Sequence, residues 1–336
     1  MSAPAPVQFA VLGAGSWGTA LALLICANGH RARIWGHEVE QVEALCRDRE
    51  NRMFLPGAPF PEGLSATASL DEALADATDC LVVVPSHAFR PVIARVAPLL
   101  PEGMGLAWAT KGLDPRSGDL LHSVAREILG ERPLAVVSGP SFALEVARGL
   151  PTAVTVASDD PAFAERIARR LHGERFRAYT SSDMVGVEVC GAAKNVLAIA
   201  TGIADGLGFG ANARAALITR GLAELIRVGT ALGGRAETFM GLAGLGDLVL
   251  TCTDNQSRNR RLGLALASGE GLAEAQARIG QEVEGVITAL AVHRLAWRLG
   301  IEMPISEQVY RVLYEGVTPM EATRALLDRE PKAELG

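Results

Sequence analysis

The sequence is poor in lysine. Only Lys111, Lys194 and Lys332 among its 32 basic residues are lysine, and the others are arginine. Wherever a generic positive charge suffices, this chain therefore uses arginine, and each lysine needs an explanation. Lys332 lies in the polar C-terminal tail, where it carries little meaning. Lys111 and Lys194 are the two that we expect to have a chemical role.

Cysteine is also scarce, and its pattern excludes two kinds of site. The five cysteines are odd in number, scattered, and free of C-x-x-C spacing. This pattern argues against a disulfide framework and against a zinc site. We expect no bound metal, and we expect the cysteines to be buried thiols in a reducing cytoplasm.

A positive net charge, a signal-type N-terminus and long apolar runs are missing too. The net charge is −6 and the isoelectric point is about 5.6, which argue against nucleic acid or an anionic membrane as a bulk partner. The first six residues have no basic region and no signal-type apolar core. We see no apolar run that approaches the length of a membrane span. The expected location is the cytoplasm.

What the chain does contain predicts two domains. Its 336 residues, 49% hydrophobic and 21% charged, suffice for two cores. The first half alternates short β-branched runs with helical stretches, which is typical of a parallel sheet covered by helices. From about Ser182 the chain becomes helical throughout. We predict an α/β dinucleotide-binding (Rossmann-type) domain over residues 1–182, followed by an all-α substrate and catalytic domain over 183–336.

The individual elements can be placed from the pattern. Strands are predicted at 7–12, 31–35, 80–84, 106–109, 134–137, 152–157 and 175–179. Helices of the second domain are predicted at 183–204, 213–232, 257–268, 271–279, 286–299, 306–315 and 319–328. Polar residues follow several of these strands, so we expect their loops to converge on one edge of the sheet, where ligands bind.

A glycine motif follows the first predicted strand. Gly13, Gly15 and Gly18 have G-x-G-x-x-G spacing, and an apolar helical stretch follows at once. Gly13 would allow the tight turn, Gly15 the approach of a pyrophosphate, and Gly18 close packing of the helix on the strand. The helix N-terminus would offer N–H groups to the phosphates. Because strand, turn and helix are all present, the motif predicts a dinucleotide site rather than a merely structural turn.

The end of the second strand bears on the choice of cofactor. An NAD site usually has an acidic residue there to bind the ribose 2′-hydroxyl, but here the strand ends in Trp35-Gly36-His37 and Glu38 comes late. The pattern therefore favours a cofactor with a 2′-phosphate, or the use of both cofactors. His37 is either a cofactor contact or a surface histidine.

Lys194 lies in an apolar helical segment. Its helical neighbours at i±3 and i±4 include no acidic residue, and Gly191 leaves room for a ligand. It is either a lysine that extends from a buried helix to solvent or a general base whose pKa is lowered by burial. The scarcity of lysine favours the second interpretation, since arginine cannot be deprotonated in proteins.

Three further stretches carry candidate ligand-binding residues. Lys111 comes at the end of a strand next to a turn glycine, which favours ligand contact over a simple loop charge. Asp247 lies in a glycine-rich apolar run, where a buried carboxylate needs a partner such as a lysine. Residues 251–261 bring hydroxyls, amides and arginines to a helix start, a combination that suits a phosphate dianion better than a solvated loop.

With these residues in view, the chain resembles the bacterial NAD(P)-dependent glycerol-3-phosphate dehydrogenases over nearly its whole length. The most specific matching motifs are Val83-Val84-Pro85-Ser86-His87, Ala109-Thr110-Lys111-Gly112-Leu113, Lys194-Asn195-Val196, Gly208-Phe209-Gly210-Ala211-Asn212, Gly244-Leu245-Gly246-Asp247-Leu248 and Thr251 to Arg261.

The resemblance implies a role for each matching residue. Lys194 would be the proton acceptor. The glycerol phosphate would be surrounded by Lys111, Gly139, Ser141, Lys194, Asp247, Ser257, Arg258 and Asn259. The cofactor, NADPH or NADH, would touch Gly13, Gly15, Ser16, Trp17, Gly18, His37, Lys111, Ala143, Arg258, Glu282 and Glu284. Glu282 stands where the family often has an apolar residue. A cofactor contact through its backbone would be preserved despite this difference, whereas a contact through its side chain would not.

The reaction implied is reversible reduction of dihydroxyacetone phosphate to sn-glycerol 3-phosphate, which supplies phospholipid synthesis. The implied partners are a small phosphate substrate and a second copy of the chain, without nucleic acid or membrane insertion. One alternative is a β-hydroxyacid dehydrogenase, which also uses a helix lysine but acts on a carboxylate. Another is a nucleotide-sensing protein without catalysis, which would be favoured by loss of Lys194 or Asp247; both are present.

Overall fold

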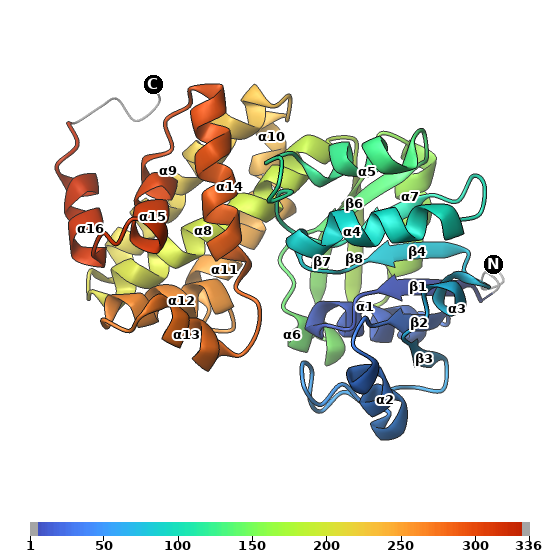
Figure 1. The fold of residues 1–336 in the computed structure, drawn as a ribbon. Helices are drawn as coiled ribbons and strands as arrows, with labels where there is room; N and C mark the ends of the chain where they lie inside the picture. Colours follow the sequence, from blue (N-terminus) through green and yellow to red (C-terminus); the bar gives the residue numbers. More distant parts are fainter. Residues whose placement is uncertain (1–5, 331–336) are drawn as a thin grey trace. The chain divides into compact units, whose positions relative to one another are not determined.

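The computed structural model describes residues 6–330, which divide into two compact units (Figure 1). The first comprises the described residues up to Asp114 together with Asp119–Glu188. The second comprises Pro115–Gly118 and the described residues from Val189 onward. The division between the units thus falls inside a helix.

The first unit is built on an eight-stranded sheet of order β3-β2-β1-β4-β5-β6-β7-β8. The strands are β1 Gln8–Leu12, β2 Arg31–Trp35, β3 Leu64–Thr67, β4 Asp79–Val82, β5 Leu106–Trp108, β6 Leu134–Ser138, β7 Thr152–Ala157 and β8 Phe176–Ser181. Neighbouring strands are parallel except for β6 and β7, which are antiparallel. This pair corrects the expectation of a parallel sheet, and β3 is an edge strand that the sequence pattern missed.

Helices lie on both faces of this sheet. They are α1 Ser16–Ala27, α2 Val39–Asp48, α3 Leu70–Leu74, α4 Ser86–Val96, the short 3₁₀ helix η1 Ala97–Leu99, α5 Leu121–Leu129, α6 Ala143–Ala147 and α7 Pro161–Leu171. Successive side chains of a strand point to opposite faces. Phe9 and Val11 of β1 therefore pack in one core with α1 and α7. On the other face Trp108 of β5 meets Phe89 of α4 edge to face, with ring centroids 5.6 Å apart.

The described part of the second unit consists of helices, as predicted. They are α8 Met184–Gly206, which begins in the first unit, α9 Gly210–Ala231, α10 Ala236–Phe239, the π-helical turn η2 Leu242–Gly246, α11 Asp247–Thr253, α12 Arg258–Ala267, α13 Leu272–Ile279, α14 Glu284–Leu299, α15 Pro304–Tyr314 and α16 Pro319–Leu327. Residues 236–253 fold into short helical elements that the pattern did not predict, because three glycines and short apolar runs hide the helical period there.

Helix α8 was predicted as a long apolar helix, but it corrects the expectation that no apolar run approaches the length of a membrane span. Its 23 residues meet the length and hydropathy of a membrane span, but 94% of its most apolar window is buried in the structure. Such burial is typical of the central helix of a globular core. Gly202 on α8 and Gly263 on α12 let these helices touch, because a Cβ on either glycine would lie 2.2 Å from a backbone carbonyl oxygen of the other helix.

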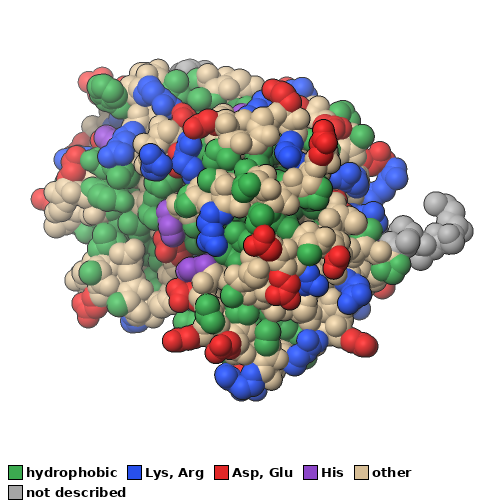
Figure 2. All heavy atoms as spheres, turned by 45° about the vertical axis from the view of Figure 1, so that its right-hand side comes forward, with side chains coloured by type: hydrophobic (Ala, Val, Ile, Leu, Met, Phe, Trp, Pro, Cys, Tyr) green, Lys and Arg blue, Asp and Glu red, His purple; other side chains and the backbone are tan. Residues whose placement is uncertain are grey.

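The five cysteines are free thiols, as expected. Cys80, Cys190 and Cys252 are buried and Cys26 is half-buried. The expectation of burial is wrong for Cys46, which is exposed on α2, where its side chain approaches the carbonyl oxygen of Ala66. Basic and acidic side chains are interspersed over the face seen in Figure 2.

Candidate active site

The glycine turn after β1 has the geometry that its motif predicts. Gly13 has a φ of 133°, and a Cβ there would lie 2.4 Å from the carbonyl oxygen of Val83. A Cβ on Gly18 would lie 2.0 Å from the carbonyl oxygen of Gly13. Beside Gly15, by contrast, there is open space within 4 Å. The turn is therefore closed where strand and helix meet and open at Gly15, which fits the approach of a cofactor pyrophosphate.

Helix α1 begins directly at this turn. Gly15 is its N-cap, no side chain caps it, and its first turn carries no acidic residue. The first N–H groups of a helix have no partner within the helix, and they attract anions. Ser16 and Trp17 are the first residues of α1, and Ala143 is the first of α6, a helix packed against α1.

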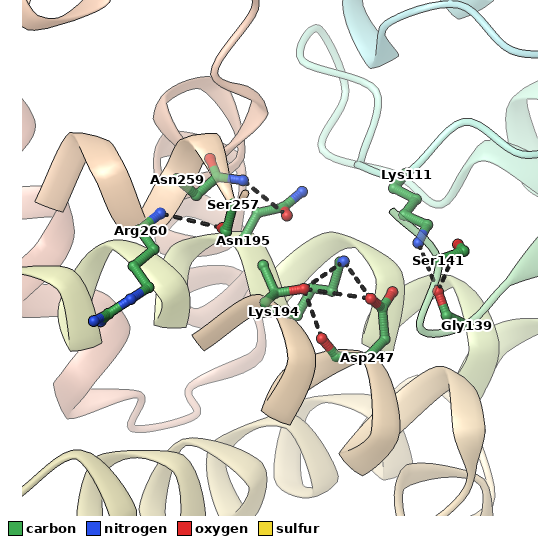
Figure 3. A network of polar contacts seen from close by, with 10 residues as sticks. Lys111, Gly139, Ser141, Lys194, Asn195, Asp247, Ser257, Asn259 and Arg260 are labelled. Atoms are coloured by element: carbon green, nitrogen blue, oxygen red, sulfur yellow. Dashed lines mark hydrogen bonds and ion pairs between the residues drawn. The ribbon is translucent and has the colours of Figure 1, made fainter. Parts of the chain in front are cut away.

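The loops after β4, β5 and β6 converge at one edge of the sheet, as predicted. The hydroxyl of Thr110 donates to the carbonyl oxygen of Val84 at 2.8 Å, which joins the first two loops. The ammonium group of Lys111 and the hydroxyl of Ser141 both donate to the carbonyl oxygen of Gly139, at 3.1 and 2.9 Å (Figure 3). Three residues named by the resemblance therefore lie together within the first unit.

His37 lies just after β2 with a largely exposed side chain. Its Nε2 is 3.1 Å from a carboxylate oxygen of Glu38, and the two side chains are 72% and 65% exposed. An exposed pair can rearrange at little cost. Either cofactor contact or a simple surface role is compatible with this position.

Lys194 and Asp247 form the buried pair that the apolar surroundings of Asp247 led us to expect. Lys194 Nζ is 2.6 Å from Asp247 Oδ1, and the side chains are 8% and 1% exposed. Lys194 also donates to the hydroxyl of Thr251 at 2.8 Å, and that hydroxyl donates to the backbone carbonyl of Asp247 at 2.6 Å. The ammonium on α8 is thus oriented by a carboxylate and a hydroxyl on α11.

The start of α12 combines a side-chain cap with a partly buried guanidinium. Ser257 is the N-cap, and its hydroxyl oxygen accepts a hydrogen bond from the N–H of Arg260 at 3.2 Å. A hydroxyl that accepts still carries a hydrogen to donate. Arg258 is half-buried and donates to the side chain of Gln281 at 3.3 Å. A helix N-terminus with this composition can bind a phosphate.

Nearby carboxylates partly offset the effect of burial on the pKa of Arg258. Burial lowers the pKa of its guanidinium, whereas Glu284 and, more weakly, Glu282 raise it. Glu284 is the first residue of α14, and Glu282 is exposed just before it. Since arginine stays protonated throughout the physiological range, Arg258 remains a fixed positive charge.

Asn259 holds three helices together. Its amide nitrogen donates to the side chain of Asn195 on α8 at 3.0 Å, and its oxygen accepts from the N–H of Gly285 on α14 at 2.9 Å. Sequence reasoning assigned Asn259 to the substrate and gave no structural role to Asn195. The second N–H of the Asn259 amide is the one with which a substrate contact can be made.

Sequence reasoning also missed the buried charge cluster around Arg260. Arg260 is 7% exposed, donates to the side chain of Asn255 at 3.1 Å, and pairs with Asp205 at the end of α8. Arg214 pairs with the same carboxylate at 2.7 Å. Two arginines converge on one half-buried acid, and α12 is thereby anchored to α8.

Within residues 6–330 no group of three or more His, Cys, Asp and Glu side chains is placed to hold a metal ion.

Taken together, a Rossmann-type unit with a glycine turn and a helical unit with a buried lysine–carboxylate pair define an NAD(P)-dependent dehydrogenase. Family models for the N-terminal and C-terminal parts of NAD-dependent glycerol-3-phosphate dehydrogenase match residues 8–164 and 183–324. The chain belongs to this family.

Individual relatives agree with this assignment. Glycerol-3-phosphate dehydrogenase [NAD(P)+] of Thioalkalivibrio sulfidiphilus is 60% identical over 97% of this chain and 98% of its own length. The protein of the same name from Methylococcus capsulatus is 59% identical over 96% and 97%. A crystal structure of glycerol-3-phosphate dehydrogenase from Coxiella burnetii matches with a TM-score of 0.95 and 53% identity, over 97% of this chain and 100% of that chain.

Proposed function

We propose that Lys194 is the residue that exchanges the proton in the reaction for which the family is named. The enzyme catalyses the reversible, NAD(P)H-dependent reduction of dihydroxyacetone phosphate to sn-glycerol 3-phosphate, a precursor of phospholipids. The observation that carries the proposal is the buried Lys194–Asp247 pair with its hydroxyl partner Thr251.

The pair explains how a lysine serves this reaction. When C2 of the ketone is reduced, its oxygen becomes an alkoxide and needs a proton. The carboxylate of Asp247 stabilises the charged ammonium form of Lys194, which is the form that donates. In the oxidation direction the neutral amine would take the proton back from the alcohol. The hydroxyl of Thr251 fixes the direction of the ammonium group.

The phosphate end of the substrate is assigned to the start of α12. Ser257, Arg258 and Asn259 bring a hydroxyl, a guanidinium, an amide and the first N–H groups of the helix to one place. In the first unit, Lys111, Gly139 and Ser141 remain our further candidates for substrate contact, supported by their shared hydrogen bonds. A phosphate dianion is the ligand that such a donor set suits best.

The cofactor is assigned to the glycine turn and the start of α1. When bound there, NADPH or NADH supplies the hydride. The backbone at Gly13, Gly15 and Gly18 gives the pyrophosphate access, and Ser16, Trp17, His37, Lys111, Ala143, Arg258, Glu282 and Glu284 are the proposed contacts. Since β2 ends without an acid, we expect NADPH to be accepted at least as well as NADH.

Two alternatives are less well supported. A β-hydroxyacid dehydrogenase would bind a carboxylate, whereas the donors at the start of α12 suit a phosphate. A nucleotide-sensing protein without catalysis would have no need of a buried lysine–carboxylate pair.

Phosphate dependence tests the assignment. Oxidation of NADPH or NADH is followed at 340 nm with dihydroxyacetone phosphate and, as the matched control, dihydroxyacetone. The phosphate ester should be reduced far better, with much of the difference in kcat, because remote binding energy positions the carbonyl. Equal kcat/KM values for the two ketones would refute the assignment of a phosphate site.

We propose that the enzyme is a cytoplasmic homodimer, on the strength of the family resemblance. Light scattering coupled to gel filtration tests the dimer, and cell fractionation tests the location. If the protein is a monomer over the range of protein concentrations used in the assay, the homodimer is excluded.

A further inference from the structure

The carbonyl oxygen of Ala14, inside the glycine turn, is held by two side chains from outside the turn. Asn51 Nδ2 donates to it at 2.9 Å, and Gln41 Nε2 donates to it at 2.8 Å. Asn51 is 1% exposed, and its amide nitrogen also donates to the buried hydroxyl of Thr19 on α1 at 2.8 Å. One amide therefore ties the turn to the helix that follows it.

The hydrogen bonds of Asn51 allow only one orientation of its amide. Its oxygen accepts from the N–H of Phe54 at 3.2 Å, which requires an acceptor there. Its nitrogen faces the carbonyl oxygen of Ala14, which requires a donor. An isosteric carboxylate at this position would place two acceptors against each other.

The segment that carries Asn51 is itself well anchored. The backbone carbonyl of Asn51 accepts from the N–H of Leu55 at 2.8 Å, and Leu55 and Phe60 are buried in the core beside α1. Arg49 donates to the carbonyl oxygens of Leu64 and Pro61 at 3.0 and 2.7 Å. The backbone that carries Asn51 is therefore held in place, so the position of its side chain against the turn is fixed.

We infer that Asn51, assisted by Gln41, is a positioning residue for cofactor binding. The peptide bond between Ala14 and Gly15 is trans and planar, so its C=O and N–H point in opposite directions. Holding the carbonyl on the side of Asn51 and Gln41 directs the N–H of Gly15 to the opposite side of the turn. This inference rests on the assignment of the pyrophosphate to the turn and adds the side chains that orient its donor.

The test uses the isosteric variant Asn51→Asp in the full-length enzyme. The dissociation constants of NADPH and ADP-ribose are measured by titration, because ADP-ribose has the pyrophosphate but lacks nicotinamide. Both dissociation constants should rise by about tenfold or more, whereas kcat at saturating cofactor should change less than about threefold. A KM effect without a kcat effect separates orientation of the turn from damage to the reacting groups.

A change of pH provides a rescue experiment for the same variant. The introduced carboxyl can donate to the Ala14 carbonyl oxygen only when it is protonated. Because position 51 is buried, the pKa of the introduced carboxyl should lie above its usual value of about 4, so the difference in ADP-ribose affinity between Asn51→Asp and the parent should shrink as the pH falls from about 8 toward 5. A merely structural defect would persist or grow at low pH.

Asn28→Ala is the matched control at the other end of α1. Asn28 also uses its amide nitrogen to hold backbone carbonyls, those of Arg170 and Leu171, at 3.1 and 2.9 Å. Loss of the Asn28 side chain should lower the melting temperature without weakening the binding of ADP-ribose. Gln41→Ala removes only one of the two donors on Ala14, so it should show a smaller loss of affinity and provides a milder variant if Asn51→Asp fails to fold.

The outcomes separate this inference from the proposed function. A parent enzyme that reduces dihydroxyacetone phosphate while folded Asn51→Asp and Gln41→Ala bind ADP-ribose within twofold of it would overturn the positioning role alone. An equal loss in Asn28→Ala would also overturn it, since the effect would then be one of general stability. A parent that binds no NADPH would instead refute the cofactor assignment.

Discussion

At the scale of single residues, burial decides which side chains are reactive. Lys194 is buried next to a carboxylate and a hydroxyl that orient it. Burial also raises the pKa of the Cys80 and Cys252 thiols to about 12 and that of Cys26 to about 11. A thiol with a raised pKa holds little thiolate near neutral pH, so these cysteines are poor nucleophiles.

This difference predicts selective thiol labelling. At pH 8, Ellman's reagent should react rapidly with one thiol of the native enzyme, Cys46, because it is exposed. After denaturation all five cysteines should react. Cys46→Ser should abolish the rapid phase and leave activity unchanged. Two or more rapidly reacting thiols in the native parent would contradict the burial described.

At the scale of elements, local signals predicted most of the fold. The glycine turn, β2 and the long helices have periodic patterns or motifs, and they occur where the sequence placed them. Helix α11 was missed because the glycine-rich stretch before it hides where it begins. The contact of Thr251 with Lys194 and that of Asn51 with Ala14 were missed as well, since these partners lie 57 and 37 residues apart and no local pattern predicted either contact.

The contact of α8 with α12 gives a prediction at this scale. Gly263→Ala would place a Cβ 2.2 Å from the carbonyl oxygen of Ile199, so the helices must separate. We expect a loss of about 2 kcal/mol or more in the free energy of unfolding, measured by urea denaturation. The KM for dihydroxyacetone phosphate should rise too, since Ser257, a proposed substrate contact, is the N-cap of α12.

Gly271→Ala is the control for that variant. Gly271 precedes α13 with a φ of −67°, and a Cβ there meets open space. Its cost should stay below about 1 kcal/mol. Equal destabilisation by the two substitutions would mean that the close helix contact does not matter.

At the scale of the whole molecule, each unit has its own chemistry. The first unit presents a glycine turn whose open side suits a pyrophosphate, and the second holds the lysine–carboxylate pair and the capped start of α12. The sequence predicted this division of labour from two motifs and from the scarcity of lysine. It predicted a lysine partner for Asp247 but not the hydrogen bond from Lys194 to Thr251, because that contact depends on α11 packing against the rest of its unit.

At this scale, turnover depends on a proton from Lys194 in the reduction direction, as proposed above. The most direct test is kcat of Lys194→Arg, because arginine keeps the positive charge beside Asp247 but cannot exchange a proton near neutral pH. Thermal melts and NADPH titration establish that the variant folds and binds cofactor. Lys332→Arg, outside the residues that the structure describes, is the control and should behave like the parent. We expect kcat to fall by about 10²–10⁴-fold. A folded, cofactor-binding Lys194→Arg enzyme within about tenfold of the parent kcat would show that the proton comes from elsewhere.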